Sequence, residues 1–417
     1  MHRLASAHAT AAMDVVRDLL AGQFDPARRR FHRWLLCAPA IGASPSFAQG
    51  PSVAGRLLRV GPNRDIRRIA DAARLARNGD TVEIDAGSYR ADVATWTQSD
   101  LTVRGIGGRA VLDAAGTSAE GKAIFVTRGQ RTLIENVEFR GTAVADRNGA
   151  GIRLETGSLT LRHCAFLYND TGLMTANSGD IALDIQYCEF AHNGIANDTL
   201  ATHQLYVGSI GRLTVWGCYF HHGLRGHLLK SRARTSMIQY SRLTDEGGQA
   251  SYELEFANGG EAYVIGNLIE QSPATENFNM VSYGAEAAIW SRNLFVASHN
   301  TLVNRRLLGG RFFQLKRAPD LIRVENNLLV GPALTGLPGE DGVGPNPRAW
   351  FGSLADTDGF DFRLRAQASV REAPLGDSSP VGEWSLRPRY EYRHPLSVRA
   401  LAPSQRLLPG ALHELAG

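Results

Sequence analysis

The chain has 417 residues, of which 43% are hydrophobic and 44 are glycine, and its formal net charge is +4. The first 48 residues contain six Arg and three Asp, so the remainder has a net charge of about +1, which disfavours a general binder of nucleic acid or of a membrane surface. No run of about 18 apolar residues occurs, and no membrane span is expected.

Residues 1–48 are predicted to be a leader with an export signal. The sequence RRRFHR (28–33) resembles a twin-arginine motif, a short apolar segment follows at 34–43, and SFA (46–48) resembles a cleavage site. The mature protein is therefore expected in the periplasm or outside the cell.

Residues 49–131 are predicted to hold an N-terminal cap and the first coils of a stack. Apolar residues recur at helical spacing over 65–77, and Asn78-Gly79 is a signal for the end of a helix. A strand is expected to start at 81–84. A stack of repeats needs a cap of this kind over its exposed end.

One short phrase recurs over residues 132–330, the predicted core. It reads IENVEF, LRHCAF, IQYCEF, VWGCYF, IQYSRL, VIGNLI, VASHNTL and VENNLL, and its closing apolar residues lie about 27 residues apart. Between these phrases fall short runs bounded by turn residues, such as AGIRLETG, GHLLKSRA and SYELEFANGG. Two or three brief strands per repeat predict an all-β fold, a right-handed parallel β-helix, which is a solenoid.

The start of the stack carries a resemblance to a known group of proteins. The helix, GDTVEIDAGSY (79–89) and LTVRGIGGRAVLDAAG (101–116) resemble the opening of pectate-lyase-like right-handed β-helix proteins. The resemblance covers roughly residues 57–330. It implies the fold and not the reaction, because that superfamily includes lyases, hydrolases, epimerases and non-catalytic stalks.

Three cysteines occupy the same place in successive phrases. Cys164, Cys188 and Cys218 are predicted to stack as small buried side chains. A metal or redox site is disfavoured, because no CxxC pair exists and the count without the leader is odd. After the stack, residues 331–417 are predicted to form an irregular tail that packs on the helix or caps its far end.

Charged and aromatic residues concentrate on one strand of successive coils and form the candidate site. Strand alternation predicts that Lys230, Arg232, Glu253 and Glu255 all face outward, because an unpaired charge in a dry core is costly. The candidate catalytic residues are Lys230, Arg232, Tyr206, His227, Glu253 and Glu255, and the candidate substrate-binding residues are His203, Asn279, Tyr283 and Glu286.

A groove along such a wall suits an extended acidic polysaccharide, and the natural cleavage of a uronate polymer is β-elimination. In this interpretation Lys230 is the base, Arg232 neutralises the substrate carboxylate, and Tyr206 or His227 is the acid. β-Helix alginate and chondroitin lyases are similar in using Lys and Arg in this way, with Ca²⁺ held by carboxylates. Here the two glutamates follow the lysine, so the resemblance makes Ca²⁺ a candidate cofactor without assigning its ligands. The same glutamates favour a protonated Lys230, which opposes its role as a base.

Two other functions stay open. Glu253 and Glu255, about 6.6 Å apart on one strand face, could be the acid and base of an inverting glycoside hydrolase. Alternatively, the charges are cross-strand ion pairs on a non-catalytic solenoid that binds polysaccharide or is structural. His221, His222 and His227 are not predicted to bind zinc, because they fall in a corner loop without a matching carboxylate. The partner is expected to be an acidic polysaccharide, with no nucleic acid, and the chain is expected to be a monomer.

Overall fold

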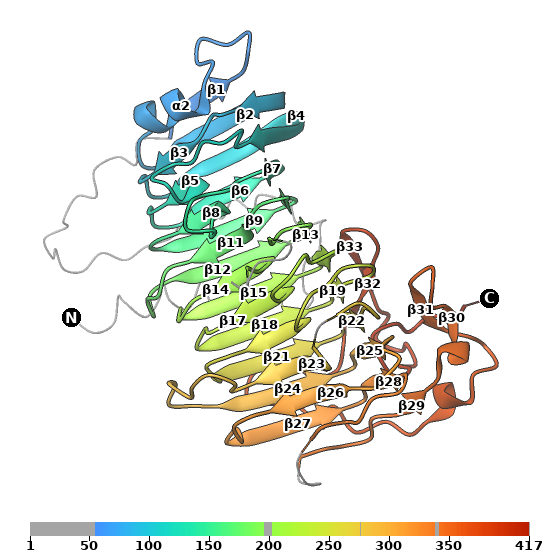
Figure 1. Ribbon diagram of the computed structural model, residues 1–417. Helices are drawn as coiled ribbons and strands as arrows, with labels where there is room; N and C mark the ends of the chain where they lie inside the picture. The colour runs from blue at the N-terminus through green and yellow to red at the C-terminus, as the bar shows by residue number, and fades with distance from the viewer. Residues whose placement is uncertain (1–54, 196–201, 276, 338–341, 417) are drawn as a thin grey trace, which may run out of the picture. The chain divides into compact units, whose positions relative to one another are not determined.

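The computed structural model describes residues 55–195, 202–275, 277–337 and 342–416. All of them belong to the second of two compact units, Gly55–Gly417, and the predicted leader and export signal lie outside the described residues. Most strands form two parallel sheets, of 20 and nine strands (Figure 1). Among the described residues, no helix has the length and apolar character needed to cross a membrane.

The 20-stranded sheet contains two rows of strands, both supplied by the repeated phrase. The first, the β6–β27 row, consists of β6 (Thr132–Glu135), β9 (Ser158–Arg162), β12 (Ala182–Gln186), β15 (Arg212–Trp216), β18 (Thr235–Gln239), β21 (Glu261–Ile265), β24 (Leu294–Ser298) and β27 (Leu321–Glu325). The second, the β7–β28 row, consists of β7 (Val137–Arg140), β10 (Ala165–Leu167), β13 (Glu189–Ala191), β16 (Tyr219–His221), β19 (Arg242–Thr244), β22 (Leu268–Gln271), β25 (Thr301–Asn304) and β28 (Leu328–Val330). The sheet also includes β1 (Leu57–Val60), β2 (Thr81–Arg90), β4 (Thr102–Asp113) and β29 (Arg348–Ala349).

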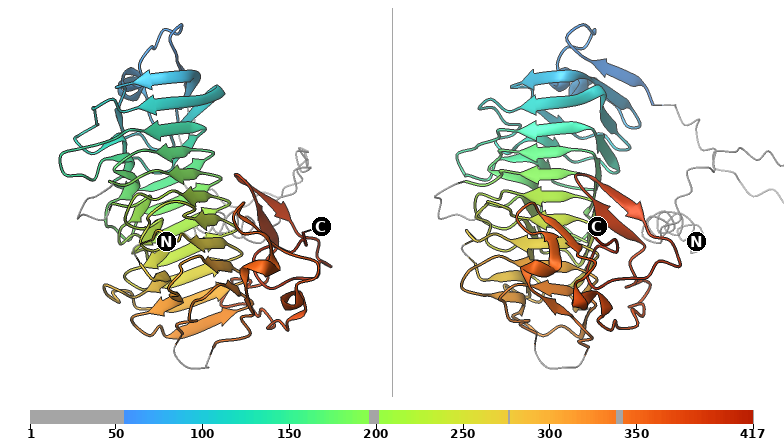
Figure 2. Two further views of the ribbon diagram at one scale, coloured as in Figure 1. Left: turned by 45° about the vertical axis from the view of Figure 1, so that its right-hand side comes forward. Right: turned by 90° about the vertical axis from the view of Figure 1, so that its right-hand side faces the viewer.

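The nine-stranded sheet is built from the runs that fall between the phrases. Its strands are β3 (Ala94–Trp96), β5 (Ala123–Thr127), β8 (Ala150–Leu154), β11 (Thr171–Thr175), β14 (Leu205–Val207), β17 (Leu229–Ser231), β20 (Leu254–Phe256), β23 (Asn279–Tyr283) and β26 (Arg311–Leu315). Each strand pairs in parallel with its equivalent one coil later. Three short strands per coil confirm the predicted parallel β-helix (Figures 1 and 2).

Large apolar side chains stack along the interior in the register of the coils. The closing residues of the phrase pair directly with one another in sequence order: Phe139, Phe166, Phe190, Phe220, Leu243, Ile269, Leu302 and Leu329. The three cysteines form the predicted buried ladder, because the backbone N–H of Cys164 lies 3.4 Å from the Cys188 sulfur and that of Cys188 lies 3.4 Å from the Cys218 sulfur. All three are free thiols.

The single α-helix of the described residues lies at the N-terminal end of the stack, against β1 and β3 (Figure 1). It is α2 (Ile69–Leu75), shorter than the range 65–77 expected from the apolar spacing. Its first N–H groups are bound by a distant residue, because the Asp92 carboxylate accepts from Ile69 at 2.7 Å and from Ala70 at 3.0 Å. A cap from another element is invisible to a local reading of the sequence.

The C-terminal tail packs along the side of the stack. It contains η1 (Phe351–Ser353), β30 (Leu354–Asp356), β31 (Asp361–Leu364), η2 (Ser369–Glu372), β32 (Tyr390–Arg393) and β33 (Ser397–Ala400). Phe362, Tyr392 and Leu408 of the tail share a buried cluster with Val303 and Leu328 of the β7–β28 row. Figure 2 shows the tail beside the C-terminal coils. This wall of the helix is therefore partly covered by the chain itself.

The phenylalanine stack gives a first test of how the coils are held together. Phe190 is fully buried, with ring centroids 4.6 Å from Phe166 and 4.7 Å from Phe220. Phe190→Ala is expected to lower the free energy of unfolding by about 3–5 kcal/mol, measured by urea unfolding. Leu307→Ala is the control: this side chain is 92% exposed, and the change should stay within about 0.5 kcal/mol. Equal losses in the two variants would contradict a core organised by the stack.

Candidate functional site

The candidate site is centred on one outward-facing column of the nine-stranded sheet. Tyr206 of β14, Lys230 of β17 and Glu255 of β20 lie directly beside one another in three successive coils. Met174 precedes this column and Ser282 follows it. Because neighbouring parallel strands are about 4.8 Å apart, the three central side chains span about 10 Å along the helix axis.

The cations of this site hold the carboxylate of Glu286, which follows β23. Arg232 binds it with two hydrogen bonds, Nε to Oε2 at 2.7 Å and Nη2 to Oε1 at 2.8 Å. The Lys230 ammonium contacts the same Oε1 at 2.7 Å. The fork geometry is the one by which arginine selects carboxylates. We call Lys230, Arg232 and Glu286 the carboxylate clamp.

Glu286 covers the two cations from the solvent side. Its side chain is 40% exposed, against 11% for Lys230 and 17% for Arg232. Burial alone would raise the pKa of Glu286, but Arg232 and Lys230 lower it to about 2. Burial opposes the charge on Arg232 as well, and Glu286 and Tyr206 more than offset this, so its pKa is raised. Glu286 and Arg232 therefore form an ion pair of two charged groups at neutral pH.

Tyr206 completes the site on the N-terminal side of Lys230. Its oxygen accepts a hydrogen bond from Nη1 of Arg232, and the guanidinium carbon lies 4.9 Å from the centre of its ring. The residue is half-buried, and its oxygen lies against the guanidinium. This placement suits a group that exchanges a proton with a ligand held by Arg232.

Two histidines lie behind the column and support Glu255. Nε2 of His227 is 3.0 Å from Oε2 of Glu255, and Lys230 Nζ is 3.0 Å from the same oxygen. The backbone N–H of His227 donates to Nδ1 of His203 at 2.9 Å. Burial, and then the charges of His227 and Lys230, keep the pKa of His203 well below its usual value. Burial would raise the pKa of Glu255, but His227 and Lys230 lower it.

The prediction that Glu253 faces outward with Glu255 is wrong. Glu253 is fully buried, and its Oε2 accepts a long hydrogen bond from Nε2 of Gln271 at 3.4 Å. Strand β20 has three residues, Leu254–Phe256, and alternation holds only within it. One residue earlier the chain is still turning a corner, and the equivalent positions of the neighbouring coils, Leu228 and Met280, lie in the core. The two glutamates share no face, so the paired-carboxylate arrangement of an inverting hydrolase is not formed.

Three of the four predicted substrate-binding residues also lie inside. Tyr283 pairs with Phe256 in the core-facing register, is 1% exposed, and donates its hydroxyl to the Gly260 carbonyl at 2.7 Å. Asn279 is buried at the entry to β23, where its amide donates to Asn277 at 3.0 Å. His203 is buried too. Among the four predicted binding residues, Glu286 alone reaches the outer surface.

The buried Glu253 makes stability depend on pH. Burial, and next the nearby Asp245, raise its pKa well above 4.5, so the folded state binds its proton more tightly than the unfolded state. Its contribution is thus greatest below pH 4.5 and is lost as the pH rises towards the raised pKa. The melting temperature is expected to fall as the pH rises from 4.5 towards this raised pKa, and by less in Glu253→Gln. Glu286→Gln should keep the wild-type fall, because the Glu286 pKa of about 2 lies outside this range; an unchanged fall in Glu253→Gln would contradict the assignment.

The carboxylates beside Lys230 do not fit a calcium site. Ca²⁺ takes six to eight oxygen ligands, whereas Glu255 and Glu286 are each bound to cationic side chains of the chain. Among the residues that the structure describes, one group of three possible ligands comes together within 4.8 Å, formed by His221, His222 and Glu246. It belongs to the β7–β28 row and is separate from the carboxylate clamp.

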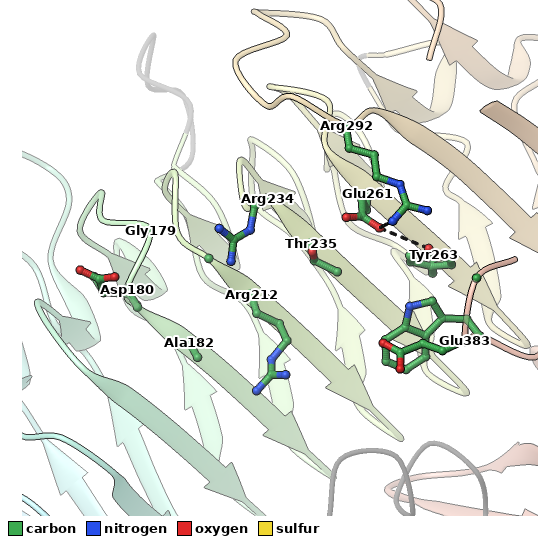
Figure 3. A pocket seen from close by; sticks show the side chains of 14 residues that line it. Gly179, Asp180, Ala182, Arg212, Arg234, Thr235, Glu261, Tyr263, Arg292 and Glu383 are labelled. Atoms are coloured by element: carbon green, nitrogen blue, oxygen red, sulfur yellow. Dashed lines mark hydrogen bonds and ion pairs between the residues drawn. The ribbon is translucent and has the colours of Figure 1, made fainter. Parts of the chain in front are cut away.

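A hollow of about 540 Å³ lies on another wall, over β12, β15, β18 and β21 (Figure 3). Arg212 and Arg234 enter it from successive coils, and neither forms an ion pair with another described residue. Arg292 is paired with Glu261 at 3.3 Å, and Trp384 of the tail forms the opposite edge. The sequence analysis missed this site. The sequence feature that could have indicated it is an arginine at or just before the start of two consecutive phrases, GRLTVW and ARTSMIQY.

Among comparisons with known proteins, the one with solved structures supports the architecture. No protein-family model matches the chain, and no curated protein matches it. Among solved structures, the crystal structure of pectate lyase Pel9A is similar, with a TM-score of 0.51 and 15% sequence identity over 82% of this chain and 97% of that one. At this identity the likeness shows the fold alone. The chain thus has the pectate-lyase-like right-handed parallel β-helix fold.

Proposed function

We propose that the protein is a polysaccharide lyase that cleaves an acidic, uronate-containing polysaccharide by β-elimination at the carboxylate clamp. The twin-arginine-like sequence at 28–33 supports export, and we place the activity in the periplasm or outside the cell. The pectate-lyase-like fold is compatible with this reaction and with several others. The choice therefore depends on the chemistry of the site.

The observation that carries the proposal is the bidentate capture of Glu286. A surface that holds one carboxylate with a guanidinium fork and an ammonium is built to hold a carboxylate of similar size. In a complex, the carboxylate of a uronate residue takes the place of Glu286. The segment after β23 that carries Glu286 must therefore move, because Glu286 lies on the solvent side of both cations.

In β-elimination the carbon beside the carboxylate loses a proton, negative charge moves onto the carboxylate, and the glycosidic oxygen leaves with a proton. Arg232 stabilises the charge that develops on the substrate carboxylate. Lys230 still contacts the Glu255 carboxylate at 3.0 Å after Glu286 is displaced, so its Nζ stays engaged as a hydrogen-bond donor. We therefore assign Lys230 to charge stabilisation rather than to proton removal.

Tyr206 is the group that we assign to proton transfer. Acting as the phenolate, Tyr206 takes the proton from the carbon beside the carboxylate. The resulting phenol gives that proton to the leaving glycosidic oxygen, which restores the phenolate. One chain end then carries a carbon–carbon double bond and the other a hydroxyl group, and no water is consumed. His227, the other acid considered, is buried behind Glu255 and acts by positioning it.

The direct test is the ultraviolet absorbance of unsaturated uronate. The mature protein is incubated with alginate, pectate, hyaluronan and bacterial exopolysaccharides, alongside Lys230→Ala. An absorbance increase that the variant loses supports a lyase with its site at the clamp. An increase that the variant retains keeps the lyase and excludes this site. No increase, together with no new reducing ends, rejects the catalytic proposal.

Removing the competing carboxylate tests the displacement of Glu286. Glu286→Gln keeps the size of the side chain but removes the charge that pairs with Arg232. The apparent affinity for an acidic oligosaccharide is expected to rise about tenfold, since the binding-competent state becomes the dominant one. The Michaelis constant and calorimetric titration measure it, with Glu372→Gln, a carboxylate of the tail that pairs with Arg406, as the control. Weaker binding by Glu286→Gln would make Glu286 a ligand-binding group instead.

The hollow near Arg212 favours a second candidate, a non-catalytic binder of acidic polysaccharide. Two guanidinium groups without an ion-pair partner and the Trp384 ring suit the carboxylates and the faces of sugar rings. Binding without turnover, lost in the double variant Arg212→Ala/Arg234→Ala and kept in Lys230→Ala, would support this function. The reverse pattern would support the lyase.

A further inference from the structure

A column of unusual backbone conformation marks the corner that follows the β7–β28 row. Tyr168, His192, His222 and Glu246 have positive φ angles of 58°, 56°, 50° and 62° in successive coils. The rings of Tyr168 and His192 are stacked at 4.9 Å, and those of His192 and His222 lie 4.8 Å apart. Side chains of neighbouring coils therefore lie next to one another at this corner.

Three ligand atoms meet at the C-terminal end of this column. Nδ1 of His221 lies 2.7 Å from Nδ1 of His222, and Nδ1 of His222 lies 3.9 Å from Oε2 of Glu246. Ligand atoms of a tetrahedral zinc site are about 3.3 Å apart, given metal–ligand distances near 2.0 Å. The two observed distances lie on either side of this value, so small side-chain rotations would suffice to close the site.

The hydrogen bonds of His221 fix the ring nitrogen that it offers. Its Nε2 lies 3.2 Å from a carboxylate oxygen of Glu189, which can only accept when ionised, so Nε2 carries the hydrogen. The lone pair of the neutral ring is then on Nδ1, directed at His222. A carboxylate that orients a histidine through its second nitrogen is the usual support of a metal ligand.

The hydrogen bonds of Glu246 leave one oxygen for a ligand. Its Oε1 accepts from the Tyr219 hydroxyl at 2.6 Å, from Thr244 at 3.0 Å and from Arg242 at 3.2 Å. Its Oε2, the atom that faces His222, is engaged in none of these bonds. The carboxylate is thus held rigidly by one oxygen and presents the other. The His222 side chain is 38% exposed, which provides access from solvent.

We infer that His221, His222 and Glu246 bind a divalent transition metal of the zinc class, with water completing the coordination. Two imidazoles and one carboxylate suit Zn²⁺, Co²⁺ or Fe²⁺, whereas Ca²⁺ and Mg²⁺ prefer oxygen ligands. The expectation that these histidines lack a matching carboxylate is therefore wrong, because Glu246 comes from the next coil. His227 is not part of the group, since it contacts Glu255 on the nine-stranded sheet.

The metal would act as a cross-link between coils. Glu189 is the first residue of β13. His221 is the last residue of β16 and His222 follows it, and Glu246 follows β19. The ligands and their support therefore span three consecutive coils. A ligand that binds only the folded state stabilises it in proportion to its occupancy. This inference does not depend on the proposed lyase activity, because the carboxylate clamp belongs to the other sheet.

The test is thermal unfolding of the untagged chain with ZnCl₂, CoCl₂ or CaCl₂ after treatment with a chelator. Zn²⁺ or Co²⁺ in about hundredfold excess over the dissociation constant should raise the melting temperature by about 3–6 °C, and Ca²⁺ should not. Bound Co²⁺ should give visible d–d absorption at one equivalent per chain. A polyhistidine tag must be removed, because it binds the same ions.

Two conservative variants locate the effect. His222→Asn keeps a residue that tolerates positive φ, and Glu246→Gln keeps the acceptor for Tyr219; both should abolish the shift and the absorption while melting as the wild type does without metal. His163→Ala removes a histidine that stacks on Tyr187, outside the group, and should retain both signals. No shift in the wild type would mean that the two imidazoles are joined by a hydrogen bond and bind no metal. A shift retained by both variants would mean that the metal binds elsewhere. Either result overturns the inference.

Discussion

Arg232→Ala is expected to lower kcat for an acidic polysaccharide by about 100- to 1,000-fold, the loss typical of removing one donor that stabilises a developing negative charge. Arg232 supplies both hydrogen bonds of the fork that holds Glu286, and no other described arginine contacts this carboxylate. An alanine leaves Lys230 as a single point charge, which binds a carboxylate without fixing the plane of its two oxygens. We therefore expect kcat to decrease by a larger factor than the affinity for the polysaccharide.

Arg234→Ala is the matched control for this loss. It removes the same side chain two residues further along the chain, but Arg234 lies in the hollow on the other sheet (Figure 3). Initial rates at saturating polysaccharide are expected to be unchanged in Arg234→Ala. Equal losses of kcat in the two variants would contradict the assignment of the charge-stabilising role to Arg232. A loss in Arg234→Ala alone would move the reaction to the hollow.

The architecture could be predicted from the sequence because the β-helix repeats one local pattern. Each closing residue, from Phe139 to Leu329, pairs with its neighbours at the spacing that the sequence shows, and every coil contacts mainly the coils beside it. The cysteine ladder followed from the same logic. The length of α2 did not, because its first N–H groups are bound by Asp92, a residue that lies beyond the helix in the sequence.

The site could be predicted in part, and the limit has a physical cause. Alternation correctly placed Tyr206, Lys230 and Glu255 on one face, since each lies at the centre of a three-residue strand. It failed for Glu253, which lies one residue before its strand, where the corner turns the side chain inward. In a strand of three residues, the alternation of side chains between the two faces does not extend to the residues on either side of the strand.

Contacts between corner residues of separate coils could not be predicted from the sequence. Glu286 reaches Arg232 from 54 residues away, and Glu246 reaches His222 from the following coil. Neither pair has a fixed spacing, because both residues lie in corners whose lengths vary between coils. The repeat predicts which strands are neighbours, and it leaves open which corner residues meet.

Tyr206→Phe and Lys230→Arg together decide which group moves the proton. Tyr206→Phe removes one oxygen and leaves the fork between Arg232 and Glu286 intact, so binding should be preserved. If Tyr206 takes the proton, kcat is expected to fall by about 100- to 10,000-fold, as for the loss of a general acid–base group. Lys230→Arg keeps a positive charge beside Glu255 and should stay within about 100-fold of the wild type, if Lys230 acts through its charge.

If Lys230 were the base, the expected results for these two variants would be reversed. A guanidinium does not give up its proton in a protein, so a lysine that served as the base could not be replaced by arginine, and Lys230→Arg would be as inactive as Lys230→Ala. Tyr206→Phe would then keep most of its turnover. Nζ of Lys230 is engaged by two carboxylates, Glu255 at 3.0 Å and Glu286 at 2.7 Å. Among the described side chains, the Tyr206 oxygen is hydrogen-bonded to the guanidinium of Arg232. Electrostatics therefore favours tyrosine as the proton carrier, with lysine and arginine as the charges that make the proton at the neighbouring carbon acidic.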